Sequence, residues 1–90
     1  MTMPRYGAKR DASEPEIVKA LRNLGVDVVL IDQPCDAILG FRGRTVLAEF
    51  KTGKAKLKKH QSDFKNTWRG SAVLTMRTPD DAINFVNGAA

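Results

Sequence analysis

The spacing of hydrophobic positions changes several times along this chain, and each spacing is typical of one kind of secondary structure. Apolar residues three and four positions apart predict helices, whereas short β-branched or alternating runs predict strands. The expected elements are a helix over residues 13–24, strands over 26–31, 36–41 and 45–51, a helix over 57–68, a strand over 72–76 and a last helix after Thr78.

The order of these elements predicts an α/β domain that runs helix, three-strand meander, helix, strand, helix. The helical crossover before the fourth strand favours a parallel pairing, so the expected sheet is mixed and four-stranded. Residues 1–12 show no apolar periodicity and carry several basic side chains. They are interpreted as a flexible N-terminal arm, and the folded domain is expected over 13–90.

Particular side chains are expected in the core and at the helix ends. Leu24 belongs to the apolar stripe of the first helix, Trp68 to that of the second, and Ile83 to the buried side of the last. Ser13 and Glu16 stand at the two capping-box positions of the first helix. Their side chains are therefore expected to bond free backbone amides at its start.

Composition narrows the class of protein. The 90 residues are 42% hydrophobic and 28% charged, with a net charge of +5, which is typical of one soluble domain with an affinity for polyanions. The single cysteine, Cys35, excludes an internal disulfide and a Cys-rich zinc site. Neither a signal peptide nor a run of about 20 apolar residues is found. We expect a cytoplasmic protein without a membrane partner.

The third strand holds the most informative residues, Glu49, Phe50 and Lys51. Because strand side chains alternate, Glu49 and Lys51 share one face of the sheet and Phe50 points to the other. A carboxylate and an ammonium therefore lie together on the face opposite a large apolar side chain.

The turn before this strand determines which residue of the second strand lies beside it. The Arg-Gly-Arg segment over 42–44 is a hairpin signal. If its last two residues form the turn, the register places Asp36 opposite Lys51. Asp36 and Glu49 are then diagonal neighbours on one face, about 7 Å apart.

Two carboxylates beside an ammonium suggest a divalent ion. Mg²⁺ is commonly held by one or two carboxylates together with water and substrate phosphate. Asp36 and Glu49 would be the ligands, and Lys51 would bind the phosphate or position the attacking water. The alternative is a solvated strand face, on which Glu-x-Lys is common.

Two further polar residues each allow two interpretations. Glu16 either caps its helix or, at the border of the apolar face, reaches the sheet. Gln61 falls on the buried side of the second helix with Phe64. It is either a satisfied core glutamine or a residue directed at Lys51 or the phosphate.

Basic residues gather after the proposed site. They are Lys54, Lys56, Lys58, Lys59, His60, Lys65 and Arg69, and Arg10 lies in the arm. Such residues suit contacts with nucleic-acid phosphates, although a solvated helix face is the alternative. Trp68, at helical spacing from Phe64, is assigned to the core rather than to the stacking of bases.

The ordered set of Glu16, Asp36, Glu49-Phe50-Lys51 and Gln61 resembles the PD-(D/E)XK nuclease superfamily. Within it, the chain is similar to the small stand-alone VRR-NUC (virus-type replication-repair nuclease) proteins, including phage-encoded ones. The phrases Leu47-Ala48-Glu49-Phe50-Lys51-Thr52-Gly53 and Trp68-Arg69-Gly70 support this likeness, which runs from about residue 10 to residue 86.

The resemblance implies a role for each matched residue. Asp36, Glu49, the backbone carbonyl of Phe50 and Glu16 would bind Mg²⁺ or Mn²⁺. Lys51 and Gln61 would complete the catalytic set. The implied activity is that of a homodimeric, metal-dependent endodeoxyribonuclease acting on branched DNA such as Holliday junctions, in the host bacterial cytoplasm if the protein is phage-encoded.

The chain departs from the family pattern at one position. Cys35 separates Pro34 from Asp36, whereas the family usually places proline directly before the aspartate. The alternative function is therefore a nuclease-like DNA-binding or regulatory module that does not cleave. A third possibility is a protein-interaction domain whose charged strand is simply surface.

Overall fold

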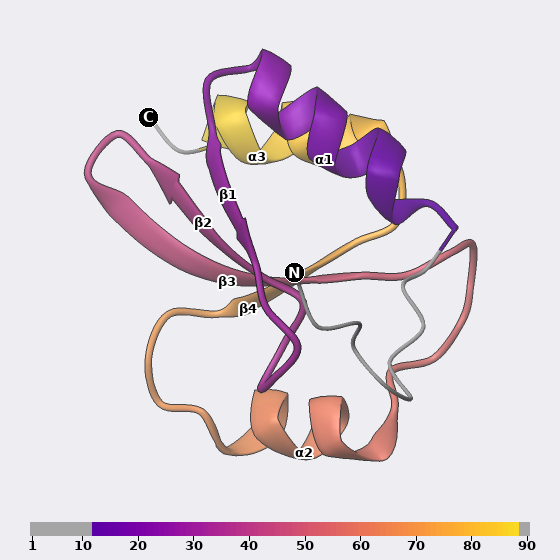
Figure 1. Ribbon diagram of the computed structural model, residues 1–90. Helices are drawn as coiled ribbons and strands as arrows, with labels where there is room; N and C mark the ends of the chain where they lie inside the picture. The colour runs from indigo at the N-terminus through magenta and orange to yellow at the C-terminus, as the bar shows by residue number, and fades with distance from the viewer. Residues whose placement is uncertain (1–11, 89–90) are drawn as a thin grey trace, which may run out of the picture.

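The computed structural model describes residues 12–88 (Figure 1). Within them it confirms a small α/β domain with three helices and a mixed four-stranded sheet. The elements are α1 (Glu14–Asn23), β1 (Asp27–Leu30), β2 (Ala37–Phe41), β3 (Arg44–Phe50), α2 (Lys59–Thr67), β4 (Val73–Met76) and α3 (Pro79–Gly88). None of these helices is long and apolar enough to cross a membrane. The predicted arm lies outside the described residues except for Ala12.

The sheet has the strand order β1-β2-β3-β4, so β1 and β4 form its edges. β2 pairs antiparallel with both β1 and β3, whereas β3 and β4 run parallel. In Figure 1, α1 and α3 lie on one side of the sheet and α2 lies on the other. Among residues 12–88, α2 is therefore the single helix on its side of the sheet.

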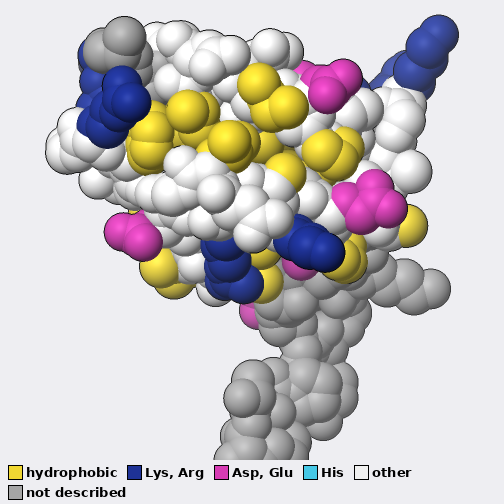
Figure 2. All heavy atoms as spheres, turned by 90° about the horizontal axis from the view of Figure 1, so that it is seen from above, with side chains coloured by type: hydrophobic (Ala, Val, Ile, Leu, Met, Phe, Trp, Pro, Cys, Tyr) yellow, Lys and Arg dark blue, Asp and Glu magenta, His cyan; other side chains and the backbone are white. Residues whose placement is uncertain are grey.

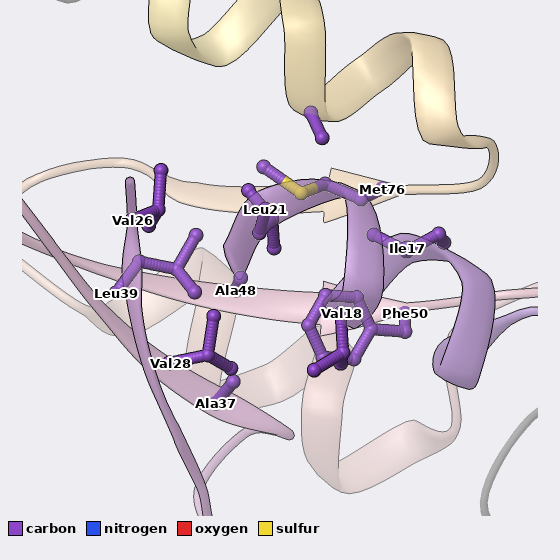
Figure 3. Packing of buried hydrophobic residues seen from close by; sticks show 11 residues of the cluster. Ile17, Val18, Leu21, Val26, Val28, Ala37, Leu39, Ala48, Phe50 and Met76 are labelled. Atoms are coloured by element: carbon purple, nitrogen blue, oxygen red, sulfur yellow. The ribbon is translucent and has the colours of Figure 1, made fainter. Parts of the chain in front are cut away.

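The hydrophobic core lies between the sheet and the α1–α3 layer. Ile17 and Leu21 of α1 pack with Phe50 and Met76 of the sheet, and all four are at most 1% exposed (Figure 3). Because side chains alternate along β3, burial of Phe50 in this layer directs the neighbouring Glu49 to the opposite face, toward α2. The apolar core thereby determines which way the candidate site faces.

The predicted register of the β2–β3 hairpin is wrong by two residues. Arg42 and Gly43 form the turn, with φ of 52° and 77°, and Phe41 pairs with Arg44. A two-residue turn with positive φ at both positions favours glycine as its second residue. Gly43 therefore ends the turn instead of beginning it, and every pair in the hairpin shifts accordingly.

This shift changes the neighbours of Asp36. Ala37 pairs with Ala48, and the N–H of Asp36 donates to the Ala48 carbonyl at 3.1 Å. Asp36 therefore lies beside Glu49, and the prediction that it lies opposite Lys51 is wrong. A shift of two positions keeps the same side-chain face, so both carboxylates still share one face of the sheet.

The predicted capping box of α1 is wrong. Ser13 makes no side-chain bond to the amides of the helix. Its hydroxyl donates instead to the Lys51 carbonyl at 3.1 Å, and its N–H donates to the Thr52 hydroxyl at 3.4 Å. The serine thus connects the start of α1 to the end of β3, two segments far apart in the sequence.

Three apolar residues expected in the core are exposed. Leu24 is 38% exposed, Ile83 45% and Trp68 46%. Leu24 and Trp68 lie directly after the last residues of α1 and α2, at the ends of these helices. In α3 the buried residue is Ala82, and Ile83 stands about 100° around the helix from it.

Candidate active site

Glu49 is a buried charge without a hydrogen-bonding partner in the described part of the chain. Its side chain is 0% exposed, and within residues 12–88 neither carboxylate oxygen has a hydrogen bond. Burial, followed by repulsion from Asp36, raises the pKa of Glu49 from 4.5 to about 7, against the opposing effects of Lys65 and Lys51. Because a bare buried carboxylate is costly, this position requires a proton or a cation.

Asp36 is the second carboxylate and is held by the backbone of β3. Its Oδ2 accepts a hydrogen bond from the N–H of Phe50 at 2.8 Å. Its own N–H is bonded to β3 as well. Both bonds lead to the strand that carries Glu49, so β3 positions Asp36 next to that residue.

Two lysines bring positive charge to the carboxylates from different elements. Lys51 is 4% exposed and follows β3, where its N–H donates to the Met76 carbonyl at 3.0 Å. Lys65 belongs to α2, and its ammonium donates to the Thr75 hydroxyl at 2.9 Å. Thr75 is the β4 partner of Glu49. The sequence pattern placed Lys65 only among phosphate contacts, although its spacing of four from Gln61 indicates the same helix face.

Gln61 lies in the first turn of α2 and is 5% exposed. Its Oε1 accepts a hydrogen bond from the N–H of Lys58 at 3.1 Å, so the side chain of Gln61 caps a free backbone amide at the start of α2. This contact supports the interpretation of a satisfied buried glutamine. The side-chain NH₂ group is still chemically suited to donate to a phosphate.

The two acidic residues of α1 differ from the sequence-based expectation. Glu16 is exposed, whereas Glu14 is 5% exposed. Glu14 lies three, four and seven residues before the buried Ile17, Val18 and Leu21, a spacing that places it on the same helix face. The helical spacing in the sequence indicates a buried position for Glu14, whereas the capping-box pattern favours Glu16 as the functional residue. Glu14 also follows Ser13, which bonds to the Lys51 carbonyl.

The basic residues after β3 form an exposed surface. All of Lys54, Lys56, Lys58, Lys59 and His60 are exposed, and Arg10 lies outside the described residues. Lys59 is paired with Asp63 at 2.7 Å. Sequence patterns missed Arg77, whose guanidinium donates to the carbonyls of Gly53 at 2.8 Å and Ala55 at 2.7 Å. Arg77 thereby holds the loop that leads from Lys51 to α2.

Cys35, the departure from the family pattern, is buried beside the site. Its Sγ donates to the Ala37 carbonyl at 3.6 Å. Burial raises the pKa of the Cys35 thiol above its usual value. Because a thiolate and not a thiol is the metal ligand, Cys35 serves here as a packed thiol.

The donor set fits a hard divalent cation that water and substrate also help to bind. Residues 12–88 contain no group of three or more His, Cys, Asp and Glu side chains that could hold a metal. Mg²⁺ needs only one or two carboxylates when phosphate and water supply the remaining oxygens. Asp36 and Glu49 are two such carboxylates, and a cation bound there would give the buried oxygens of Glu49 a partner.

Comparisons with known proteins do not assign this chain to a family. A scan against models of protein families, a search of curated proteins and a search of solved structures each gave no match. The chemistry of the site therefore has to be argued from its own residues.

The raised pKa of Glu49 predicts a pH-dependent stability in metal-free protein. Below pH 4.5 the carboxyl is protonated in both folded and unfolded chains. As the pH rises toward 7, only the folded chain keeps the proton, so the free energy of unfolding falls, by up to about 3 kcal/mol. Urea unfolding in EDTA at several pH values between 4.5 and 8 measures this loss.

Glu49→Gln is expected to remove that part of the pH dependence, and Asp63→Asn, which changes an exposed carboxylate, is expected to retain it. Mg²⁺ at pH 8 is expected to stabilise the native protein and not Glu49→Gln. Equal pH slopes for the native protein and Glu49→Gln would contradict the raised pKa.

Proposed function

We propose that this protein is a metal-dependent endonuclease in which Asp36 and Glu49 bind Mg²⁺ or Mn²⁺. The observation that carries the proposal is the fully buried carboxylate of Glu49, which has no hydrogen-bonding partner among residues 12–88 and lies beside a second carboxylate bonded to the same strand. A carboxyl group buried in this way favours either a proton or a bound cation, and the neighbouring carboxylate of Asp36 supports the cation.

The neighbouring side chains have separate tasks in phosphodiester hydrolysis. The metal, when bound, supplies Lewis acidity and a coordinated water of lowered pKa. Lys51 donates to the scissile phosphate or positions the attacking water, and its burial strengthens that electrostatic interaction. The Phe50 carbonyl lies between Glu49 and Lys51 in the chain and is the proposed third ligand.

The proposed substrate is DNA. The net charge of +5 and the exposed lysines between β3 and α2 favour a polyanion, since lysines in such positions contact phosphates regardless of base sequence. A preference for branched DNA follows from the resemblance to the VRR-NUC proteins.

A DNA-binding module without cleavage is the second candidate. The observation that favours it is the pKa of Glu49, which at about 7 leaves the carboxyl partly protonated at neutral pH. A proton there competes with the metal, while the basic surface is unaffected. Cleavage measurements separate the two candidates.

The first-helix carboxylate of the site is proposed to be Glu14 instead of Glu16. Glu14 is buried, whereas Glu16 is exposed. The adjacent Ser13 hydroxyl is anchored to the Lys51 carbonyl, so the start of α1 lies next to the catalytic end of β3.

The resemblance also suggests a homodimer, and one face is suited to it. Figure 2 shows the face formed by α1 and α3, where hydrophobic side chains gather across the middle. Ile83 of α3 and Leu24 at the end of α1 are large exposed hydrophobic residues. A second copy on this surface would bury apolar area that a chain of 90 residues cannot cover alone.

Cleavage of labelled Holliday-junction and linear duplex DNA tests the nuclease proposal. Native protein is expected to cut with Mg²⁺ or Mn²⁺ and not with EDTA, and to prefer the junction. Lys51→Ala and Asp36→Ala are expected to lower the rate by about 100-fold or more. The matched controls Lys19→Ala and Asp80→Ala change exposed residues of α1 and α3 and are expected to cut normally. DNA binding without cleavage in either metal would select the second candidate.

A paired substitution distinguishes the two acidic residues of α1. Glu14→Gln is expected to lower the cleavage rate about tenfold or more, because it removes a buried carboxylate next to Ser13, which is bonded to the Lys51 carbonyl. Glu16→Gln is expected to change the rate less than twofold. Circular dichroism and urea unfolding check that both variants fold. The reverse order of effects would assign the role to Glu16, as the resemblance implied.

Sedimentation equilibrium tests the dimer and its interface. Ile83→Asp is expected to shift the protein from dimer to monomer at a concentration where native protein is dimeric, because the new carboxylate would be buried without a partner. Val29→Asp is the control, since Val29 is 57% exposed on the edge strand β1. Dissociation by Val29→Asp alone would place the interface at that edge.

A further inference from the structure

Trp68 is an aromatic side chain in an unexpected environment. It is the single tryptophan of the chain, and it is 46% exposed directly after α2. Its ring is stacked on that of Phe64, with centroids 5.2 Å apart and an angle of 30° between the planes. The exposed indole is therefore supported from one side by a second aromatic ring.

The backbone of Trp68 is hydrogen-bonded to the end of α2, and the space beside its ring is limited. The N–H of Trp68 donates to the Phe64 carbonyl at 2.8 Å. A β-carbon at Gly70 would lie 2.6 Å from three atoms of the indole, closer than such atoms can approach. A side chain at position 70 would displace the outer end of the indole, so Gly70 leaves room for the ring as it lies against Phe64.

The charge around this aromatic pair is positive. Lys65 lies one turn before Trp68, and the exposed Arg69 follows it. The acidic residue of this half of α2, Asp63, is already paired with Lys59 at 2.7 Å. A fixed aromatic ring flanked by cations suits a nucleotide, because the base can stack on the ring while the cations bind the phosphates.

The position of Trp68 connects it to the proposed site. Gln61, Lys65 and Trp68 are spaced by four and three residues, so they follow one side of α2. Lys65 acts on the pKa of Glu49 and bonds to Thr75 in the adjacent strand. Along the helix axis, Trp68 is about 10 Å from Gln61, which corresponds to about three stacked base steps.

We infer that Trp68 stacks on an unpaired nucleobase of a DNA strand whose backbone runs along α2. The stacked pair of Trp68 and Phe64 forms the platform, and Lys65 and Arg69 bind the flanking phosphates. The platform selects strands with accessible bases over continuous duplex, in which the base faces are already stacked. The role of this platform in positioning a phosphate for cleavage rests on the proposed nuclease function. The stacking of a base on Trp68 does not depend on that function.

Binding of metal-free, full-length protein to short oligonucleotides in EDTA tests the inference. The probes are a single strand of mixed sequence, the same strand with several abasic positions, and the matching duplex. Because Trp68 is the single tryptophan, its fluorescence reports contact directly. The single strand is expected to quench it, and the abasic strand and the duplex are expected to quench it much less.

Paired variants separate stacking from simple packing. Trp68→Phe keeps an aromatic ring, whereas Trp68→Leu keeps apolar bulk against Phe64 without one. Trp68→Leu is expected to weaken single-strand binding about 5- to 100-fold and duplex binding less than twofold, and Trp68→Phe is expected to retain most of the affinity. Gly70→Ala, which displaces the indole, is expected to act like Trp68→Leu. Anisotropy of labelled oligonucleotides measures affinity, and urea unfolding confirms that each variant folds.

The outcomes keep this inference separate from the nuclease proposal. Equal binding of single strands by native protein and Trp68→Leu overturns the inference, as does an equal loss for single strand and duplex. A native protein that binds no nucleic acid overturns it as well and leaves Trp68 as a protein contact. If the affinity for single strands depends on the ring but no DNA is cut with Mg²⁺ or Mn²⁺, base stacking holds and the nuclease proposal fails.

Discussion

The buried carboxylate of Glu49 is the constraint to which the rest of the site is adjusted. Water is excluded from it, and its oxygens have no hydrogen bond among residues 12–88. Two lysines from opposite ends of the crossover and one fixed carboxylate surround it. This balance raises the pKa of Glu49 to about 7, and the proposed divalent cation would relieve both the desolvation and the repulsion.

The alternation of side chains along β3 links the position of Glu49 to the packing of the hydrophobic core. Phe50 is buried among the apolar residues under α1 and α3, so Glu49 and Lys51 must face α2. A register slip of one residue would place the charges in the core and expose the phenyl ring. The stability of the apolar layer therefore also maintains the orientation of the charged residues.

Much of this arrangement was predictable from the sequence, because burial imposes periods that can be read directly. The helices, the strands and the shared face of Asp36 and Glu49 follow from those periods. The register and the position of Trp68 do not, since both depend on backbone conformation at a few residues. Gly43 occupies the second position of the turn, and Gly70 leaves room for the indole of Trp68. Hydrophobic periodicity predicts neither of these features. The buried Glu14 did have one, but a local capping pattern competed with it.

The two hydrogen bonds from Arg77 to the carbonyls of Gly53 and Ala55 have a consequence for how the protein meets a ligand. They join Arg77, directly after β4, to the loop after β3. The segment from this loop through α2 and β4 is therefore connected at both of its ends. The backbone that carries the loop lysines is consequently arranged during folding. If the loop binds a polyanion as proposed, less backbone entropy would be lost on association, and charge would contribute more to the affinity than ordering of the loop.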